Sequence, residues 1–186
     1  MLHLTVLVFK MKKIIALLLT TLVFVSYTHP KDPNRILWSK DRPLTWFDFK
    51  APAKQNQGYD AMTEYSIDYD QVNNRTGVFC YFEKSKSWRI KKQETDYLLK
   101  HEQYHFNIAE IYARKLRKQI IELKLMDDQK ELKKAYNKIF NECSKAQNNY
   151  DKETSHSRNS EAQAKWEKDM DIQMQELNDS SDPFLE

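Results

Sequence analysis

The feature that most constrains the fold is the absence of proline and glycine between Trp88 and Pro183. Because these two residues are the strongest interruptions of a helix, their absence favours long helices over this part of the chain. Thr95 is suited to cap the start of the first helix. Residues at spacings of three and four then form one continuous stripe, which is typical of a helix face turned to the core. The stripe consists of Leu98, His101, His105, Ile108, Tyr112 and Leu116.

Two more helices are expected after the first. Asp127 or Asp128 can cap a second helix, which is predicted to end near the start of a polar stretch. That stretch, residues 148–160, is rich in turn formers, so we predict a loop or the start of a helix there. A third helix is predicted from about residue 160 to residue 177, followed by a flexible tail over residues 179–186.

The N-terminal part of the chain carries strand signals instead. Residues 63–70 alternate aromatic or apolar side chains with polar ones, a period of two that is typical of a half-buried strand. The turn-forming stretch NNRTG at 73–77 and the apolar residues 78–82 complete a predicted hairpin. Residues 29–60 are predicted to be irregular with short strands. The predicted fold class is α+β, a small antiparallel sheet or hairpin followed by about three helices, in a single domain over residues 29–178.

The first 28 residues differ from the rest of the chain. They carry three lysines, no acidic residue and the apolar run Ile14–Val25, which is too short to span a bilayer but suits a secretory signal peptide. Met11 begins a complete basic and apolar leader by itself, so it is an alternative start. We predict cleavage before about His29 and export to the periplasm or the medium, with no membrane span after removal. The alternative is a retained N-terminal anchor.

Charge and cysteine content bear on partners and compartment. Removal of the leader takes away three lysines, so the formal net charge falls from +3 to about zero and gives no reason to expect nucleic acid as a partner. In an oxidising compartment Cys80 and Cys143 either form a disulfide or remain two separate buried thiols. The sequence does not indicate an oligomeric state.

The most informative motif is HEQYH at residues 101–105. His101 and His105, four residues apart, lie on one face of a helix and can reach the same ion. Glu102 points about 100° away round the helix and is free to act as a base, which is the arrangement of the H-E-x-x-H metalloproteases. The competing interpretation is that both histidines are ordinary core or surface residues and Glu102 is a solvated charge.

A catalytic zinc site normally has three protein ligands, so a third must come from elsewhere in the chain. His156, in the polar stretch before the last helix, is the preferred candidate, because a helical hairpin can return it to the first helix. Glu110 and Glu122 are the alternatives. Glu110 points in a poor direction, about 140° from His105, and Glu122 lies on the same predicted helix as the histidines.

Several stretches of the chain resemble a known family, the bacterial predicted secreted zinc-dependent proteases, which carry an HExxH zincin-like motif on the active-site helix. The order and spacing of these stretches make the resemblance fairly specific, and it covers most of the chain after the leader. They are LTWFDF at 44–49, SW at 87–88, LLKHEQYHFNIAEIYARKLRK at 98–118, YDKETSH at 150–156 and QAKWE at 163–167.

The resemblance implies that His101 and His105 bind Zn²⁺ and that Glu102 is the base. It places His156 in a second signature block with Tyr150, Asp151 and Thr154. In that block Asp151 is a candidate to accept the second N–H of a ligand histidine, and its alternative role is a helix N-cap.

This chain departs from the family's pattern at two positions where glycine is usual, Tyr104 and Ser157. Tyr104 can line the substrate cleft, donate to a developing oxyanion or obstruct access. The change at Ser157 affects a turn in which glycine commonly supplies a positive φ.

The function predicted from these features is an exported zinc metallopeptidase. It acts on a peptide or protein substrate, with Glu102 as general base and Tyr150 or Tyr104 steadying the oxyanion. The alternative is a non-catalytic exported binding or envelope-associated protein, with a structural metal or none.

Overall fold

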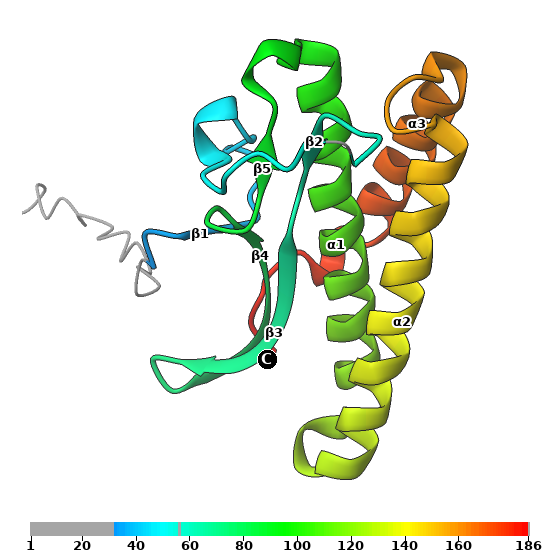
Figure 1. Cartoon of the computed structure of the whole chain (residues 1–186). Helices are drawn as coiled ribbons and strands as arrows, with labels where there is room; N and C mark the ends of the chain where they lie inside the picture. The colour runs from blue at the N-terminus through cyan, green and yellow to red at the C-terminus, as the bar shows by residue number, and fades with distance from the viewer. Residues whose placement is uncertain (1–31, 56, 186) are drawn as a thin grey trace, which may run out of the picture. The chain divides into compact units, whose positions relative to one another are not determined.

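A computed structural model describes residues 32–55 and 57–185 of the chain. The predicted signal peptide and His29 lie outside the described residues. A small antiparallel sheet is followed by three helices, which confirms the predicted α+β fold (Figure 1). The main sheet has the strand order β1-β4-β3, and a second, two-stranded sheet pairs β2 with β5. The strands are β1 (Arg35–Leu37), β2 (Ala61–Met62), β3 (Tyr65–Val72), β4 (Arg75–Glu83) and β5 (Trp88–Arg89).

Strands β3 and β4 form the predicted hairpin, and their register pairs Val72 with Arg75. The two residues between them, Asn73 and Asn74, both have positive φ, at 51° and 64°. Asparagine tolerates this conformation, and a tight turn of this kind matches the twist of the strands. Strand β4 is buried from Gly77 to its end because β1 and β3 flank it and α1 covers it.

Three helices follow the sheet: α1 (Asp96–Glu122), α2 (Gln129–Thr154) and α3 (Ser160–Glu176). Each begins at a side-chain cap, and the caps on α1 and α2 are among those predicted. Thr95 accepts from the backbone N–H of Leu98 at 3.1 Å. Asp128 accepts from the backbone N–H groups of Lys130 and Glu131 at the start of α2. Helix α1 is the central element, since it packs against β3 and β4 on one side and against α2 and α3 on the other. It therefore buries more than one face.

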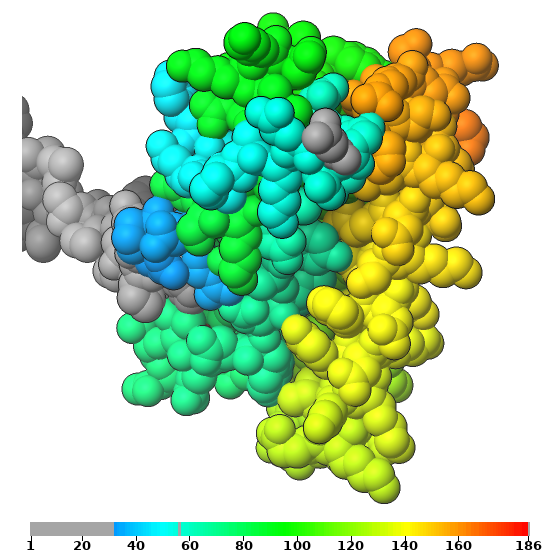
Figure 2. Space-filling view, in the orientation of Figure 1, coloured from blue at the N-terminus to red at the C-terminus, as the bar shows by residue number. Residues whose placement is uncertain are grey.

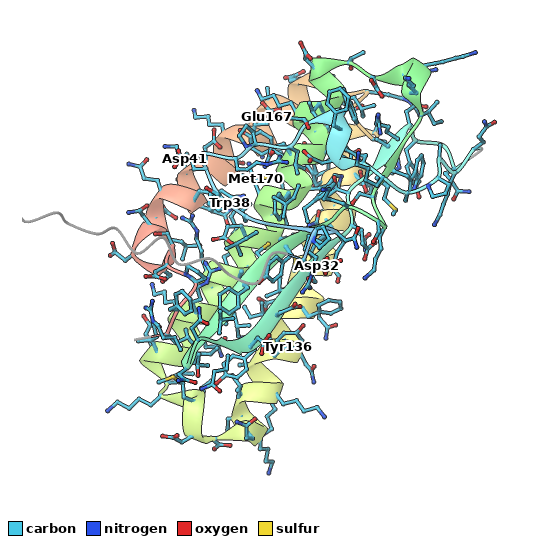
Figure 3. All side chains as sticks on the ribbon, turned by 90° about the vertical axis from the view of Figure 1, so that its left-hand side faces the viewer. Asp32, Trp38, Asp41, Tyr136, Glu167 and Met170 are labelled. Atoms are coloured by element: carbon cyan, nitrogen blue, oxygen red, sulfur yellow. The ribbon has the colours of Figure 1, made fainter. Side chains whose placement is uncertain are left out.

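Helix α2 is longer than predicted and continues to Thr154 instead of ending near residue 148. Its inner face contains buried polar residues, Gln147 and Thr154, together with Tyr150. These residues have helical spacing, but a pattern based on apolar residues does not identify a face that contains buried polar ones. As a result Asp151 lies in the last turn of α2, where the sequence predicted a loop or the start of another helix. Nearer the start of α2, Tyr136 donates its hydroxyl to the carbonyl of Ile67 on β3 at 2.7 Å (Figure 3).

The C-terminal residues, for which the sequence predicted a flexible tail, pack on the sheet in this structure. The backbone N–H of Val78 donates to the carbonyl of Pro183 at 2.8 Å, and that of Leu185 donates to the carbonyl of Thr76 at 2.9 Å. Gly77 permits this close approach, because a Cβ atom there would lie 2.7 Å from the oxygen of Pro183. Backbone pairing therefore orders the segment.

Cys80 and Cys143 are both free, buried thiols, which matches the second of the two interpretations of this pair. Within the described residues, none of the helices is both long enough and apolar enough to cross a bilayer.

Candidate metal centre

The two histidines of the HEQYH motif face each other from consecutive turns of α1. Their Nε2 atoms lie 3.1 Å apart, and the rings meet nearly perpendicularly, at 88°. Both are buried, with 2 % and 8 % of their surface exposed for His101 and His105. This geometry follows directly from the spacing of four residues on a helix. Two nitrogen atoms at this distance must share a proton or bind a common cation.

Asp151 brings a carboxylate oxygen to the same point from α2. Its Oδ1 lies 3.3 Å from Nε2 of His101 and 3.1 Å from Nε2 of His105. These three ligand atoms all lie within 4.8 Å of one another. The sequence placed Asp151 behind an imidazole, as the acceptor of its second N–H. The structure places it among the ligand atoms instead, because the extension of α2 carries it over the histidine pair.

This donor set fits a divalent metal ion. In a tetrahedral site with bonds of about 2.0–2.1 Å, the ligand atoms are about 3.3 Å apart, and the three separations observed here are 3.1–3.3 Å. Two imidazoles and one carboxylate also match the ligands of known catalytic zinc sites. Imidazole and carboxylate bind other first-row metals as well, so these residues form a candidate metal-binding group whose donors do not define one metal.

His156 lies beside this group, outside the set of mutually close ligand atoms. Its Nδ1 is 3.1 Å from Oδ1 of Asp151, and its ring stacks on Tyr59 with centroids 5.2 Å apart. The sequence predicted His156 as the third ligand; in this structure the carboxylate of Asp151 is the group close to both imidazoles, and His156 contacts that carboxylate. The physical reason is again the length of α2, which leaves His156 in the turn just beyond the helix.

The turn that carries His156 is conformationally strained. Ser155, His156 and Ser157 have φ values of 50°, 52° and 67°, in the left-handed region that residues with a side chain rarely adopt. The resemblance led us to expect glycine at Ser157, and the positive φ of this residue is one that favours glycine. Strain of this kind persists only where the surroundings hold the backbone in place.

Glu102 lies next to the histidines with its carboxylate buried. Oε2 accepts a hydrogen bond of 2.8 Å from the hydroxyl of Thr63, and 2 % of the residue is exposed. Burial raises the pKa of Glu102 to about 7, against the opposing effects of His105 and the Thr63 hydroxyl. Sequence reasoning assigned Thr63 only to a strand, because no local signal connects it to a helix almost forty positions later.

The charges in the site are coupled through Asp151. Burial favours the neutral carboxyl, but hydrogen bonds from His101 and His105 outweigh it and hold the pKa of Asp151 well below its ordinary value. Burial also lowers the pKa of His101. For His105, burial opposes the charge, but the hydrogen bond and charge of Asp151 raise its pKa to about 9. Asp151 is therefore an anion that attracts positive charge to this point.

A cavity of about 340 Å³ opens onto these groups. Helix α1 contributes His101, Glu102 and His105 to its wall, α2 contributes Asp151, and the chain before β3 contributes residues 59–63. Figure 2 shows this last segment in cyan beside the turn between α2 and α3 in orange, in agreement with the stacking of Tyr59 on His156. A solute can thus reach the histidines and the glutamate from one opening.

Three other predicted site residues point away from the cavity. Tyr104 donates its hydroxyl to Asp171 on α3 at 3.0 Å, so it pairs α1 with α3 and does not line the cleft. Tyr150 stacks on His101 with centroids 4.6 Å apart and is completely buried, so it supports the imidazole from behind. Thr154 donates to the backbone carbonyl of Tyr150 at 2.7 Å, within its own helix.

Neither alternative glutamate ligand reaches the site. Glu110 is buried in ion pairs with Arg114 and Arg117 further along α1. Glu122 is the last residue of α1 and is exposed, with an ion pair to Lys118 at 3.8 Å.

Comparison with known proteins gives one family match. The model of the family described as "Bacterial protein of unknown function (DUF922)" matches residues 82–157. This segment contains Glu102 and all of the ligand atoms described above, together with His156. No curated protein and no solved structure matches the chain.

Proposed function

We propose that this protein is an exported zinc-dependent peptidase that hydrolyses peptide bonds with Glu102 as general base. The observation that carries the proposal is the convergence of His101, His105 and Asp151 beside a buried glutamate on the wall of one cavity. A buried carboxylate with a raised pKa, next to a metal-type donor set, is an arrangement that favours catalysis over a purely structural role.

In this proposal His101, His105 and Asp151 hold the zinc ion. When bound, the ion supplies Lewis acidity at this point of the cavity. His156 contacts Oδ1 of Asp151 at 3.1 Å and so orients the carboxylate toward the two imidazoles.

Glu102 moves the protons of the reaction. Its Oε2 accepts the Thr63 hydroxyl at 2.8 Å, which fixes the orientation of the carboxylate. A base whose pKa lies near neutral pH can take a proton from water and later release it to a leaving amine. Thr63 supplies a neutral donor, so it orients the carboxylate without neutralising it.

Measurement of metal content and turnover tests this function. We expect the purified protein to contain about one zinc ion per chain by mass spectrometry, and Asp151→Asn to reduce zinc affinity. Asp171→Asn is a matched control, because Asp171 faces Tyr104 on the other side of α1. If the protein carries no metal and added zinc produces neither binding nor peptide cleavage, the proposal is wrong. Stable zinc binding without cleavage of any peptide would favour the non-catalytic alternative.

Export is the remaining part of the proposal, and the composition of residues 1–28 supports it. Mass spectrometry of the protein recovered from cell fractions tests it. A mature chain beginning near His29 outside the cytoplasm is the expected result, and an uncleaved chain in the cytoplasm contradicts it.

A further inference from the structure

The protonation of the two imidazoles decides whether they can bind a metal. A neutral imidazole carries a proton on one ring nitrogen, and only the other nitrogen can be a ligand. At His105 the structure shows what faces the nitrogen on the far side of the ring from the metal site. Nδ1 lies 2.6 Å from Oε1 of Gln147, and Nε2 of the same amide donates to the backbone carbonyl of His105 at 2.9 Å. Both residues are buried.

These two contacts determine which end of the Gln147 side-chain amide faces the imidazole of His105. A backbone carbonyl can only accept, so the NH₂ end of Gln147 must face it, and the oxygen end must then face the ring. An amide oxygen also can only accept, so Nδ1 of His105 must carry the proton. In a neutral ring, Nε2 of His105 is therefore the nitrogen that is free to bind a cation, and it faces His101 and Asp151.

His101 has a second glutamine behind it, on α3. Its Nδ1 is buried without a well-aligned partner among the described residues, and Oε1 of Gln163 is in the same condition. Burial lowers the pKa of His101, and Gln163 is among the neighbours that act to raise it. Nδ1 of His101 can donate and Oε1 of Gln163 can only accept, so the two buried atoms are complementary.

A carboxylate sets the direction of this second amide. Nε2 of Gln163 donates to Oε1 of Glu167 at 3.0 Å, and Oε2 of Glu167 lies 2.7 Å from the ammonium of Lys100. Glu167 lies on the side of α3 that is turned toward α1 (Figure 3). Because Glu167 accepts, Gln163 must present its NH₂ end there, and its oxygen is left for Nδ1 of His101.

We propose that Gln147 and Gln163 are positioning residues that hold His101 and His105 in the Nδ1-protonated tautomer, so that both Nε2 atoms can bind the metal. This inference rests on the proposed metal centre and names the groups that prepare its ligands. Partners of this kind behind a ligand histidine commonly change metal affinity by about 10- to 100-fold.

Zinc affinity measured by competition with a chelator tests the inference. Gln147→Met and Gln163→Met each remove the acceptor and keep a side chain of similar length, and each is expected to weaken zinc binding by about 10- to 100-fold. Gln103→Met is the matched control on α1, because the amide of Gln103 bonds Leu44 and Asn107 instead. The control is expected to bind zinc as the unmodified protein does.

The tautomers can also be read without any substitution. In ¹⁵N-histidine NMR spectra of the zinc-loaded protein we expect Nδ1 of His101 and His105 to be protonated and Nε2 of each ring to bind the metal. Protonation or coordination with the opposite assignment in either ring overturns the inference, even if a variant fails to fold.

The outcomes separate the two proposals. If the unmodified protein binds no zinc, the metal centre itself is wrong, and the inference that rests on it fails with it. If it binds zinc and both methionine variants bind equally tightly, the metal centre stands and the role of the glutamines is wrong.

Discussion

Helix α1 buries two glutamates, Glu102 and Glu110, to the same exposure of 2 %, but their surroundings differ. Glu110 accepts from Arg114 at 2.9 Å and from Arg117 at 2.8 Å, so its charge is compensated twice. Glu102 accepts from the neutral hydroxyl of Thr63 and lies on the wall of a cavity. One carboxylate is enclosed by opposite charge, and the other faces a space that a solute can enter.

The comparison shows how one helix serves two purposes. Around Glu110 the polar groups are satisfied within the protein, since Arg117 also donates to the carbonyl of Val78 at 2.8 Å and thereby joins α1 to β4. Around Glu102, the negative charges that act on His105 are those of Asp151 and of Glu102 itself. A buried charge that is compensated supports the fold, whereas one held by a neutral group remains available for proton transfer.

The largest expected effect is on turnover. We expect Glu102→Gln to reduce peptide cleavage by about 10²- to 10⁴-fold while zinc remains bound, because the amide cannot accept a proton as a base does. Cleavage rates on a peptide library and metal content measure this. The proposed difference between Glu102 and Glu110 is contradicted if Glu102→Gln loses its zinc or unfolds as readily as a Glu110 variant.

The next effect is on stability. We expect Glu110→Gln to lower the free energy of unfolding by about 3–5 kcal/mol, because it leaves two buried guanidinium groups without their carboxylate. Urea denaturation measures it. Under conditions in which the variant is folded, its zinc affinity should equal that of the unmodified protein. Equal stability of the Glu110→Gln and unmodified proteins would contradict the structural role of this cluster.

A third prediction concerns a structural carboxylate outside the helices. Burial acts to raise the pKa of Asp48, but hydrogen bonds from Arg42 and Thr45 outweigh it and hold that pKa below the ordinary value. A depressed pKa contributes stability above the ordinary pKa of aspartate, and this contribution is lost as the pH falls through the folded value. We expect Asp48→Asn to be less stable by on the order of 1 kcal/mol at pH 7, since Arg42 is half exposed.

Urea denaturation as a function of pH measures this difference. The stability gap between the two proteins should narrow as the pH falls below the ordinary pKa of aspartate, because the carboxylate then becomes protonated. A gap that is independent of pH would show that the ion pair is not its source.

The smallest expected effect is a gain in stability. Ser157 has a φ of 67°, so Ser157→Gly should raise the free energy of unfolding by about 0.5–1 kcal/mol through relief of left-handed strain. Ser181→Gly, at a φ of −78°, is the control and should give no gain. Thermal unfolding measures both. A loss of stability in Ser157→Gly would show that the serine side chain, and not strain, decides this position.

Local patterns predicted much of the architecture correctly. The β3–β4 hairpin follows from alternation and two asparagines, and α1 begins at Thr95, whose hydroxyl caps it. The pair His101 and His105 was also predictable, since a spacing of four residues places two side chains together on a helix. These features depend on contacts between residues that are close in the chain, which a short stretch of sequence contains.

The third ligand was not predictable in the same way. Asp151 reaches the histidines because α2 continues to Thr154, and its inner face there contains buried polar groups that the apolar pattern does not reveal. The packing of the tail on the sheet was not predictable for a related reason. The pairing of Pro183 with Val78 depends on space left by Gly77, and no pattern within the tail reports that space.

The sequence by itself therefore determined the helices, the hairpin, the two histidines and the glutamate beside them. Only the tertiary structure decided which carboxylate completes the donor set, that Thr63 holds Glu102, and that a glutamine lies behind each imidazole. The reason is physical. Periodicity reports which face of an element is buried, whereas a metal centre depends on the directions of a few polar atoms contributed by elements far apart in the chain.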